Sequence, residues 1–149
     1  MDASFIPARL FLGQAYVQIG NYDEAIEEFQ KALELSDRAT EILAELGHAL
    51  ARAGRTGDAQ QVLAELMQLL QSKHVSSYGI AIVHIGLDDT EQAFAWFENA
   101  MAEQSHFLPL VTVDPRLDGL RSDQRYEKLV EHIGLARLNT TLSFDSLNQ

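Results

Sequence analysis

The stretch that decides the fold runs from Leu12 to Ala32 and reads LGQAYVQIGNYDEAIEEFQKA. The stretch 34 residues further on, from Leu46 to Leu66, reads LGHALARAGRTGDAQQVLAEL. Glycine, alanine and large apolar residues recur in four columns: Gly13 with Gly47, Gly20 with Gly54, Ala25 with Ala59 and Ala93, and Phe29 with Leu63 and Phe97. A fixed period of about 34 residues is typical of helix–turn–helix repeats. The sequence therefore predicts an all-α fold built as a stack of such repeats.

The period divides most of the chain into three repeats, which we expect at residues 6–39, 40–73 and 74–107. In the first repeat we expect one helix over residues 7–19, with Leu12, Tyr16 and Ile19 on its core-facing side. Gly20 ends that helix, because glycine readily takes the left-handed conformation of a tight stop. In the third repeat Asp88 and Asp89 occupy the turn position instead.

A different pattern follows the repeats, and residues 113–126 read VDPRLDGLRSDQRY. Asp114 can cap a short helical turn that has Pro115 in its first position. A last helix is expected over residues 123–133, ended by Gly134. Because a repeat stack ends in an apolar face, we interpret residues 108–135 as a cap that covers it. Residues 136–149 are expected to form a polar, mobile tail.

The repeat columns resemble the tetratricopeptide repeat (TPR). The first unit reads L-G-x-x-Y-x-x-x-G-x-Y-x-x-A-x-x-x-F-x-x-A, although Arg9, Leu43 and Ser77 stand where that family has an early tryptophan. The closing segment, V-D-P-R-L-D-G-L-R-S-D-Q-R-Y, resembles the C-terminal TPR region of bacterial regulators and kinases. The resemblance implies a right-handed superhelical stack that acts as a non-catalytic protein-interaction module, part of a larger cytoplasmic signalling or regulatory protein.

In TPR arrays the first helix of each repeat lines a concave groove that receives a partner. The resemblance therefore predicts a protein-binding groove that suits an extended peptide or a helix. Its expected lining residues are Leu10, Gln14, Val17, Glu41, Ala44, Glu45, His48, Arg52, Tyr78 and Ile82.

Composition narrows the classes of partner. The chain has 149 residues, 11 basic against 22 acidic, and a net charge of −11. Such a chain repels phosphate backbones, so we expect no nucleic-acid binding by this domain. The acidity favours a basic protein partner, or else serves only solubility. The sequence has no apolar run of membrane-spanning length, so we expect no membrane insertion and a cytoplasmic location.

The chain shows no pattern typical of catalysis. It has no cysteine, and its five histidines never pair at the spacing that puts two ligands on one helical face. Glycine-rich phosphate loops and nucleophile elbows are also missing from the sequence. We therefore predict no catalytic residue, no metal site and no cofactor, and we rank an enzyme last among the possible functions.

One alternative to groove binding stays open. No capping helix precedes Ile6 in the sequence, so the first repeat should leave an apolar face uncovered. Self-association through that face, giving a homo-oligomer, is the second hypothesis.

Overall fold

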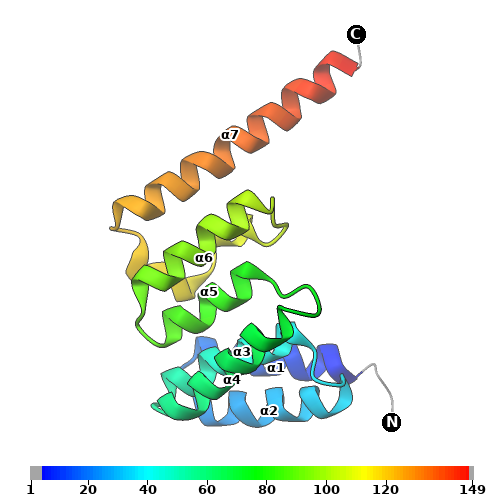
Figure 1. Cartoon of the computed structure of the whole chain (residues 1–149), viewed down its shortest axis with the longest axis vertical. Helices are drawn as coiled ribbons and strands as arrows, with labels where there is room; N and C mark the ends of the chain where they lie inside the picture. The colour runs from blue at the N-terminus through cyan, green and yellow to red at the C-terminus, as the bar shows by residue number, and fades with distance from the viewer. Residues whose placement is uncertain (1–4, 148–149) are drawn as a thin grey trace.

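The computed structural model describes the backbone of residues 5–147 and the side chains of residues 5–135. Three helical hairpins follow one another along the stack (Figure 1). Their helices are α1 (Phe5–Gln18) with α2 (Tyr22–Leu35), α3 (Thr40–Arg52) with α4 (Thr56–Leu69), and α5 (Ser77–Gly86) with α6 (Thr90–Ala102). The described residues contain no strand. The predicted fold class, an all-α stack of helix–turn–helix repeats, is confirmed.

All three hairpin turns have the same geometry although their residues differ. Gly20 and Gly54 have φ angles of 81° and 83°, and Asp88, in the same column, has a φ of 59°. In each turn the next N–H donates to a carbonyl five residues back, at 2.9 Å for Asn21, Arg55 and Asp89. Aspartate tolerates the left-handed region better than most residues, which explains how the third turn forms without glycine.

Small residues set how closely the helices approach. A Cβ on Gly13 would collide with the Phe29 ring, so this glycine lets the ring lie against the α1 backbone. Between the second and third repeats, a Cβ on Gly79 would lie 3.1 Å from the Ala44 Cβ. A Cβ on Gly86 would lie 3.1 Å from the Ala51 Cβ, so α3 and α5 are in close contact along their length.

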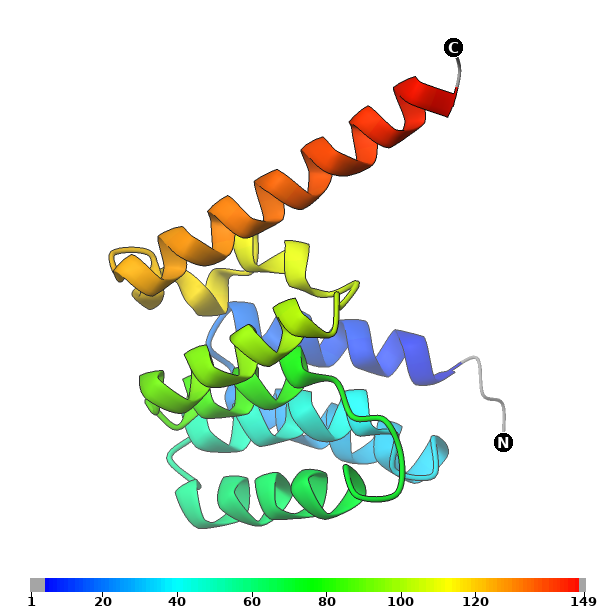
Figure 2. The ribbon, with the colours of Figure 1, turned by 45° about the horizontal axis from the view of Figure 1, so that its top comes forward.

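After α6 the chain forms two 3-10 helices, η1 (Leu108–Thr112) and η2 (Pro115–Leu120), and then α7 (Gln124–Leu147). Asp114 accepts the Arg116 N–H with Pro115 in the first helical position, as predicted. The first part of α7 lies across the end of the stack (Figure 2). These segments and the α5–α6 hairpin share one apolar core, which includes Leu108, Val111, Leu117, Leu120, Tyr126, Leu129 and Ile133.

The expected end of the last helix at Gly134 is wrong. α7 continues through Gly134 to Leu147, so residues that we expected to form a mobile tail are helical up to that point. Gly134 does not have a positive φ. One glycine costs a helix only about 1 kcal/mol, and the leucine, alanine and arginine that follow favour helix.

Of the residues predicted to face the core from α1, Tyr16 is half-buried against it, but the prediction is wrong for Leu12 and Ile19. Leu12 and Ile19 are 43% and 69% exposed, and the buried residues of α1 are Gly13 and Val17. Leu46 and Ile80, one and two repeats further on, are 5% and 0% exposed. The position is the same in each repeat, but no helix of the described chain precedes α1 to cover it.

Candidate protein-binding groove

A groove of about 640 Å³ runs between α1, α3, the α5–α6 turn and the cap. Its α1 and α3 walls are mainly polar, whereas the cap contributes Leu110, Val113 and Leu120. The other lining residues are Gln14, Val17, Gln18, Tyr22, Glu45, His48, Arg52, Ile85, Asp88, Thr90, Asp114, Pro115, Arg116 and Gly119.

Half of the residues predicted to line a groove do lie around it: Gln14, Val17, Glu45, His48 and Arg52. Leu10 is half-buried against the core, Glu41 is exposed outside the groove, and Ala44 is buried where α3 meets α5. Repeat spacing located the α1 and α3 walls because these residues project from the same side of successive first helices.

Tyr78 and Ile82 require a correction. Both were expected to line the groove at the third repeat, yet they are 5% and 2% exposed and belong to the core shared with the cap. The cap folds over the α5 side of the stack and occupies the space that a ligand would have reached. The wall at this end is therefore made by η1 and η2, which repeat spacing could not reveal.

A buried polar network attaches the cap to the repeats. The Tyr78 hydroxyl donates to Asp114 at 2.7 Å, and the Arg116 guanidinium donates to Asp114 at 2.8 Å and 3.0 Å. The same guanidinium reaches Glu45 of α3 at 2.9 Å. One arginine thus joins η2 to the second repeat, 71 residues away in sequence.

The pKa values of this network follow from burial and from its partners. Burial would raise the pKa of Asp114, but Arg116 and Tyr78 outweigh it and hold that pKa below its usual value. Burial and the neighbouring Asp114 carboxylate both raise the pKa of Tyr78. At neutral pH Asp114 is therefore ionised, Arg116 is charged and the phenol of Tyr78 is neutral.

His48 lies in the groove wall and is only 3% exposed. Its Nδ1 atom is buried and neither donates nor accepts a hydrogen bond among the described residues. Burial, followed by the charges of Arg116 and Arg52, lowers the pKa of His48 to about 3, although Asp114 acts in the opposite direction. The ring is therefore uncharged at neutral pH.

The accessible charges of the groove come from Arg52 and Asp88, 3.7 Å apart and both exposed to solvent. The cap side of the groove carries Leu110, 44% exposed, and Val113, 68% exposed. Sequence reasoning missed the two apolar residues because it treated the cap only as a cover. The groove thus offers a charged edge and an apolar edge, which suits a chain that carries both kinds of side chain.

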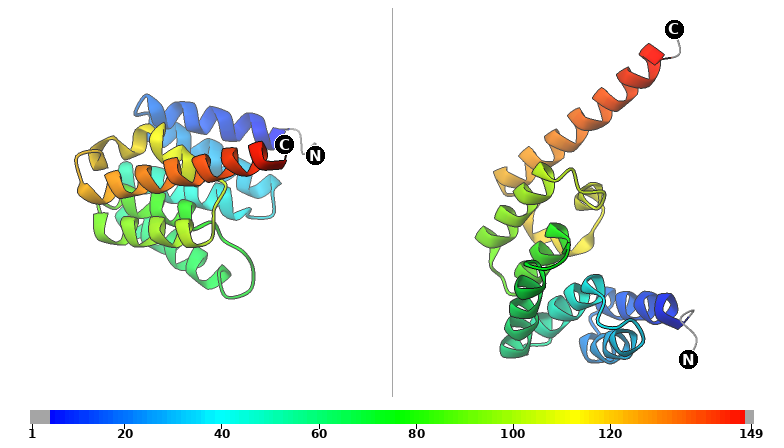
Figure 3. Two further views of the ribbon diagram at one scale, coloured as in Figure 1. Left: turned by 90° about the horizontal axis from the view of Figure 1, so that it is seen from above. Right: turned by 45° about the vertical axis from the view of Figure 1, so that its right-hand side comes forward.

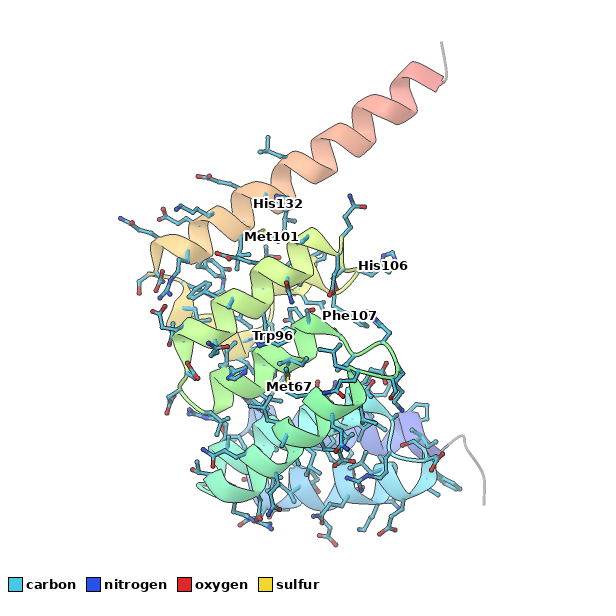
Figure 4. The ribbon with its side chains drawn as sticks, viewed as in Figure 1. Met67, Trp96, Met101, His106, Phe107 and His132 are labelled. Atoms are coloured by element: carbon cyan, nitrogen blue, oxygen red, sulfur yellow. The ribbon has the colours of Figure 1, made fainter. Side chains whose placement is uncertain are left out.

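The described part of the chain shows no candidate metal site. No cluster of three or more histidine or acidic residues there could hold a metal ion. His106 lies in the loop after α6 and His132 on α7, on different segments (Figure 4). None of the described helices combines the length and apolarity that a membrane crossing needs.

Residues 13–54, from α1 to the turn between α3 and α4, match the family model described as TPR repeat. The match supports a tetratricopeptide repeat domain. Such repeats generally mediate protein–protein interaction and are typically non-catalytic. Neither a curated protein nor a solved structure matches the chain.

Proposed function

We propose that this TPR domain is a non-catalytic docking module that binds an extended peptide or a helix in the groove between α1, α3 and the cap. The observation that carries the proposal is the groove itself, to which two successive first helices and the cap all contribute. The resemblance of residues 113–126 to bacterial regulators favours a role within a larger cytoplasmic signalling protein.

The size and surface of the groove support a peptide ligand. Its volume of about 640 Å³ is in the range of protein ligand sites. Leu110 and Val113 can contact an apolar side chain of the ligand, while Arg52 and Asp88 can pair with its charged groups. The net charge of −11 would speed the approach of a basic partner.

The test requires variants that change the groove and leave the cap in place. Glu45 is unsuitable, because its carboxylate pairs with the buried Arg116 and a reversal there would loosen the cap. Arg52→Glu and Val113→Glu change exposed side chains of the groove, one on α3 and one on the cap. Lys31→Glu on α2 makes the same change in charge as Arg52→Glu, outside the groove, and is the matched control.

Each protein would be used to capture partners from a bacterial lysate, and the affinity of any retained protein would then be measured by calorimetry. We expect Arg52→Glu and Val113→Glu each to weaken binding about tenfold or more, as loss of one well-placed contact does. Lys31→Glu should bind like the wild type. Equal affinities for all four proteins would contradict binding in the groove.

Self-association is the second candidate function. It is favoured by the apolar side chains that α1 exposes at the N-terminal end of the stack, where Phe5, Phe11 and Ile19 are each more than half exposed. The two functions use different surfaces, since α1 contributes Gln14, Val17 and Gln18 to the groove and other residues to this face.

A further inference from the structure

The uncovered side of α1 is a regular apolar stripe. Phe5, Ala8, Leu12, Ala15 and Ile19 are spaced three and four residues apart, so they share one side of the helix and of the turn that ends it. All five are exposed, Phe5 by 57%, Leu12 by 43% and Ile19 by 69%. The stripe is about 21 Å long at the rise of an α-helix.

The same positions in the second repeat show what this stripe accommodates. Ile42, Leu46 and Ala49, each 34 residues after a member of the stripe, are 3%, 5% and 0% exposed. Helix α2 of the preceding repeat packs against α3, and its Ile26 and Leu33 belong to the same core as these residues. The α1 stripe therefore corresponds in position to a surface of α3 that is buried in the stack. Figure 3 shows α1 in the outermost hairpin of the stack.

The pattern of side-chain sizes favours one particular helix as the occupant. Large residues (Phe5, Leu12, Ile19) alternate with alanines (Ala8, Ala15) along the stripe. When two copies of such a helix lie antiparallel with Leu12 of one copy opposite Ala15 of the other, Ile19 lies opposite Ala8, so two of the three large side chains face an alanine. The stripe is then complementary in shape to itself, as a two-fold symmetric interface requires.

Charge also permits a second copy at this surface. A net charge of −11 makes most contacts between two copies unfavourable. Helix α1, however, carries a single charged residue, Arg9. Arg9 pairs with Glu28 of α2 at 2.6 Å, away from the stripe. Two α1 helices can therefore meet along the stripe without bringing acidic residues of α1 together.

We infer that the α1 stripe is a homodimer interface, in which α1 of one copy lies antiparallel to α1 of the second copy. The inference rests on self-association, the second candidate function, and not on groove binding. Because the stripe lies outside the groove, both copies in the dimer keep their grooves open to a partner.

The test measures oligomeric state with the full chain. Light scattering after gel filtration should give the wild type twice the monomer mass, with a monomer fraction that grows on dilution. Leu12→Glu and Ile19→Glu should each raise the dimer dissociation constant at least tenfold, roughly the cost of losing a central interface residue. Met67→Glu replaces a 39% exposed apolar residue on α4 and should leave the dimer intact.

Two results would overturn the inference. One is a wild-type protein that stays monomeric at millimolar concentration, and the other is a dimer that persists in both stripe variants. Circular dichroism melting checks that each variant folds, and the exposure of both side chains makes unfolding unexpected. Leu12→Glu should keep its affinity for a groove partner, whereas Arg52→Glu should stay dimeric, so failure of one function is distinguishable from failure of the other.

The relative orientation of the two α1 helices can be measured separately. Because the chain has no cysteine, one introduced cysteine carries a single spin label at a chosen site. Labels at Phe11 and Gln18, two exposed positions beside the stripe, report the middle and the end of α1. An antiparallel pair predicts a longer label-to-label distance at Gln18 than at Phe11. Equal distances would indicate a parallel pair and would contradict the proposed geometry.

Discussion

The two ends of this stack differ, although both derive from the same repeat. At the N-terminal end, α1 leaves Leu12 and Ile19 exposed. At the C-terminal end, η1, η2 and α7 cover the α5–α6 hairpin, and Val111 and Leu117 are completely buried. A helical repeat produces an apolar face at each end, and only a dedicated segment can cover one. Within the described residues, the cap covers the C-terminal end of the stack, whereas nothing covers the outward side of α1.

The largest difference between the two ends should follow from removing the charge that attaches the cap to the repeats. Arg116→Ala should lower the free energy of unfolding by about 3–5 kcal/mol, because it leaves Glu45 and Asp114 without their buried cation. Urea unfolding measures the loss. Arg55→Ala removes an exposed arginine paired with Asp58 and should cost at most about 1 kcal/mol. Similar losses in the two variants would show that the cap does not depend on Arg116.

A matched pair of leucines compares the two ends directly. Leu117→Ala, in the cap, should cost about 2–5 kcal/mol of unfolding free energy because the side chain is fully buried. Leu12→Ala, at the open end, should change stability by about 0.5 kcal/mol or less in the monomer. Urea unfolding at low protein concentration measures both. If the two losses were equal, the N-terminal end would be covered in solution even at that concentration.

The dependence of the unfolding free energy on pH tests the environment of His48, in the groove wall beside the cap. The pKa of His48 is about 3 in the folded protein and near 6.5 in the unfolded chain, so the unfolded chain takes up the proton first. The contribution of His48 to stability is therefore complete above pH 6.5 and is lost as the pH falls towards 3. Between pH 6.5 and 4.5 we expect a loss of about 2 kcal/mol from this residue.

The variant His48→Gln should remove that part of the pH dependence, as measured by urea unfolding at a series of pH values. Burial also lowers the pKa of His84, so His84→Gln is the comparison for a histidine outside the groove. A wild-type slope that His48→Gln left unchanged would mean that folding does not lower the pKa of His48.

The smallest expected effect concerns the hydroxyl of Tyr78. Tyr78→Phe removes the 2.7 Å hydrogen bond to Asp114 and leaves the ring and the Arg116 pair in place. A hydrogen bond to a charged group contributes about 1.5 kcal/mol, and urea unfolding should show a loss near that value. An unchanged stability would mean that Asp114 finds a replacement donor, and that Arg116 alone holds this side of the cap.

Repeat spacing predicted much of the fold because each column has a local physical reason. Gly20 and Gly54 end helices in the left-handed region, and Ala25, Ala59 and Ala93 are all fully buried between helices. The cap turn at Asp114 and Pro115 was predictable for the same reason, since both residues act on the nearest backbone groups.

Apart from the helix end at Gly134, the errors concern residues whose surroundings depend on distant parts of the chain. Leu12 has the same local sequence pattern as Leu46, but only Leu46 has a preceding repeat above it. Tyr78 was assigned to the groove because its position on the repeat faces that way, and the cap, more than 30 residues later, buries it. In both cases burial is decided by a neighbour that local periodicity does not describe.

By itself, the sequence determined the helices, their turns and the order of the repeats, because those features follow from backbone preferences and from side-chain periodicity within about 34 residues. Only the tertiary structure decided which apolar faces are covered, that Arg116 joins Glu45 to Asp114, and where the groove lies. Burial and ion pairing depend on which segments meet in space, and here the decisive partners lie up to 71 residues apart.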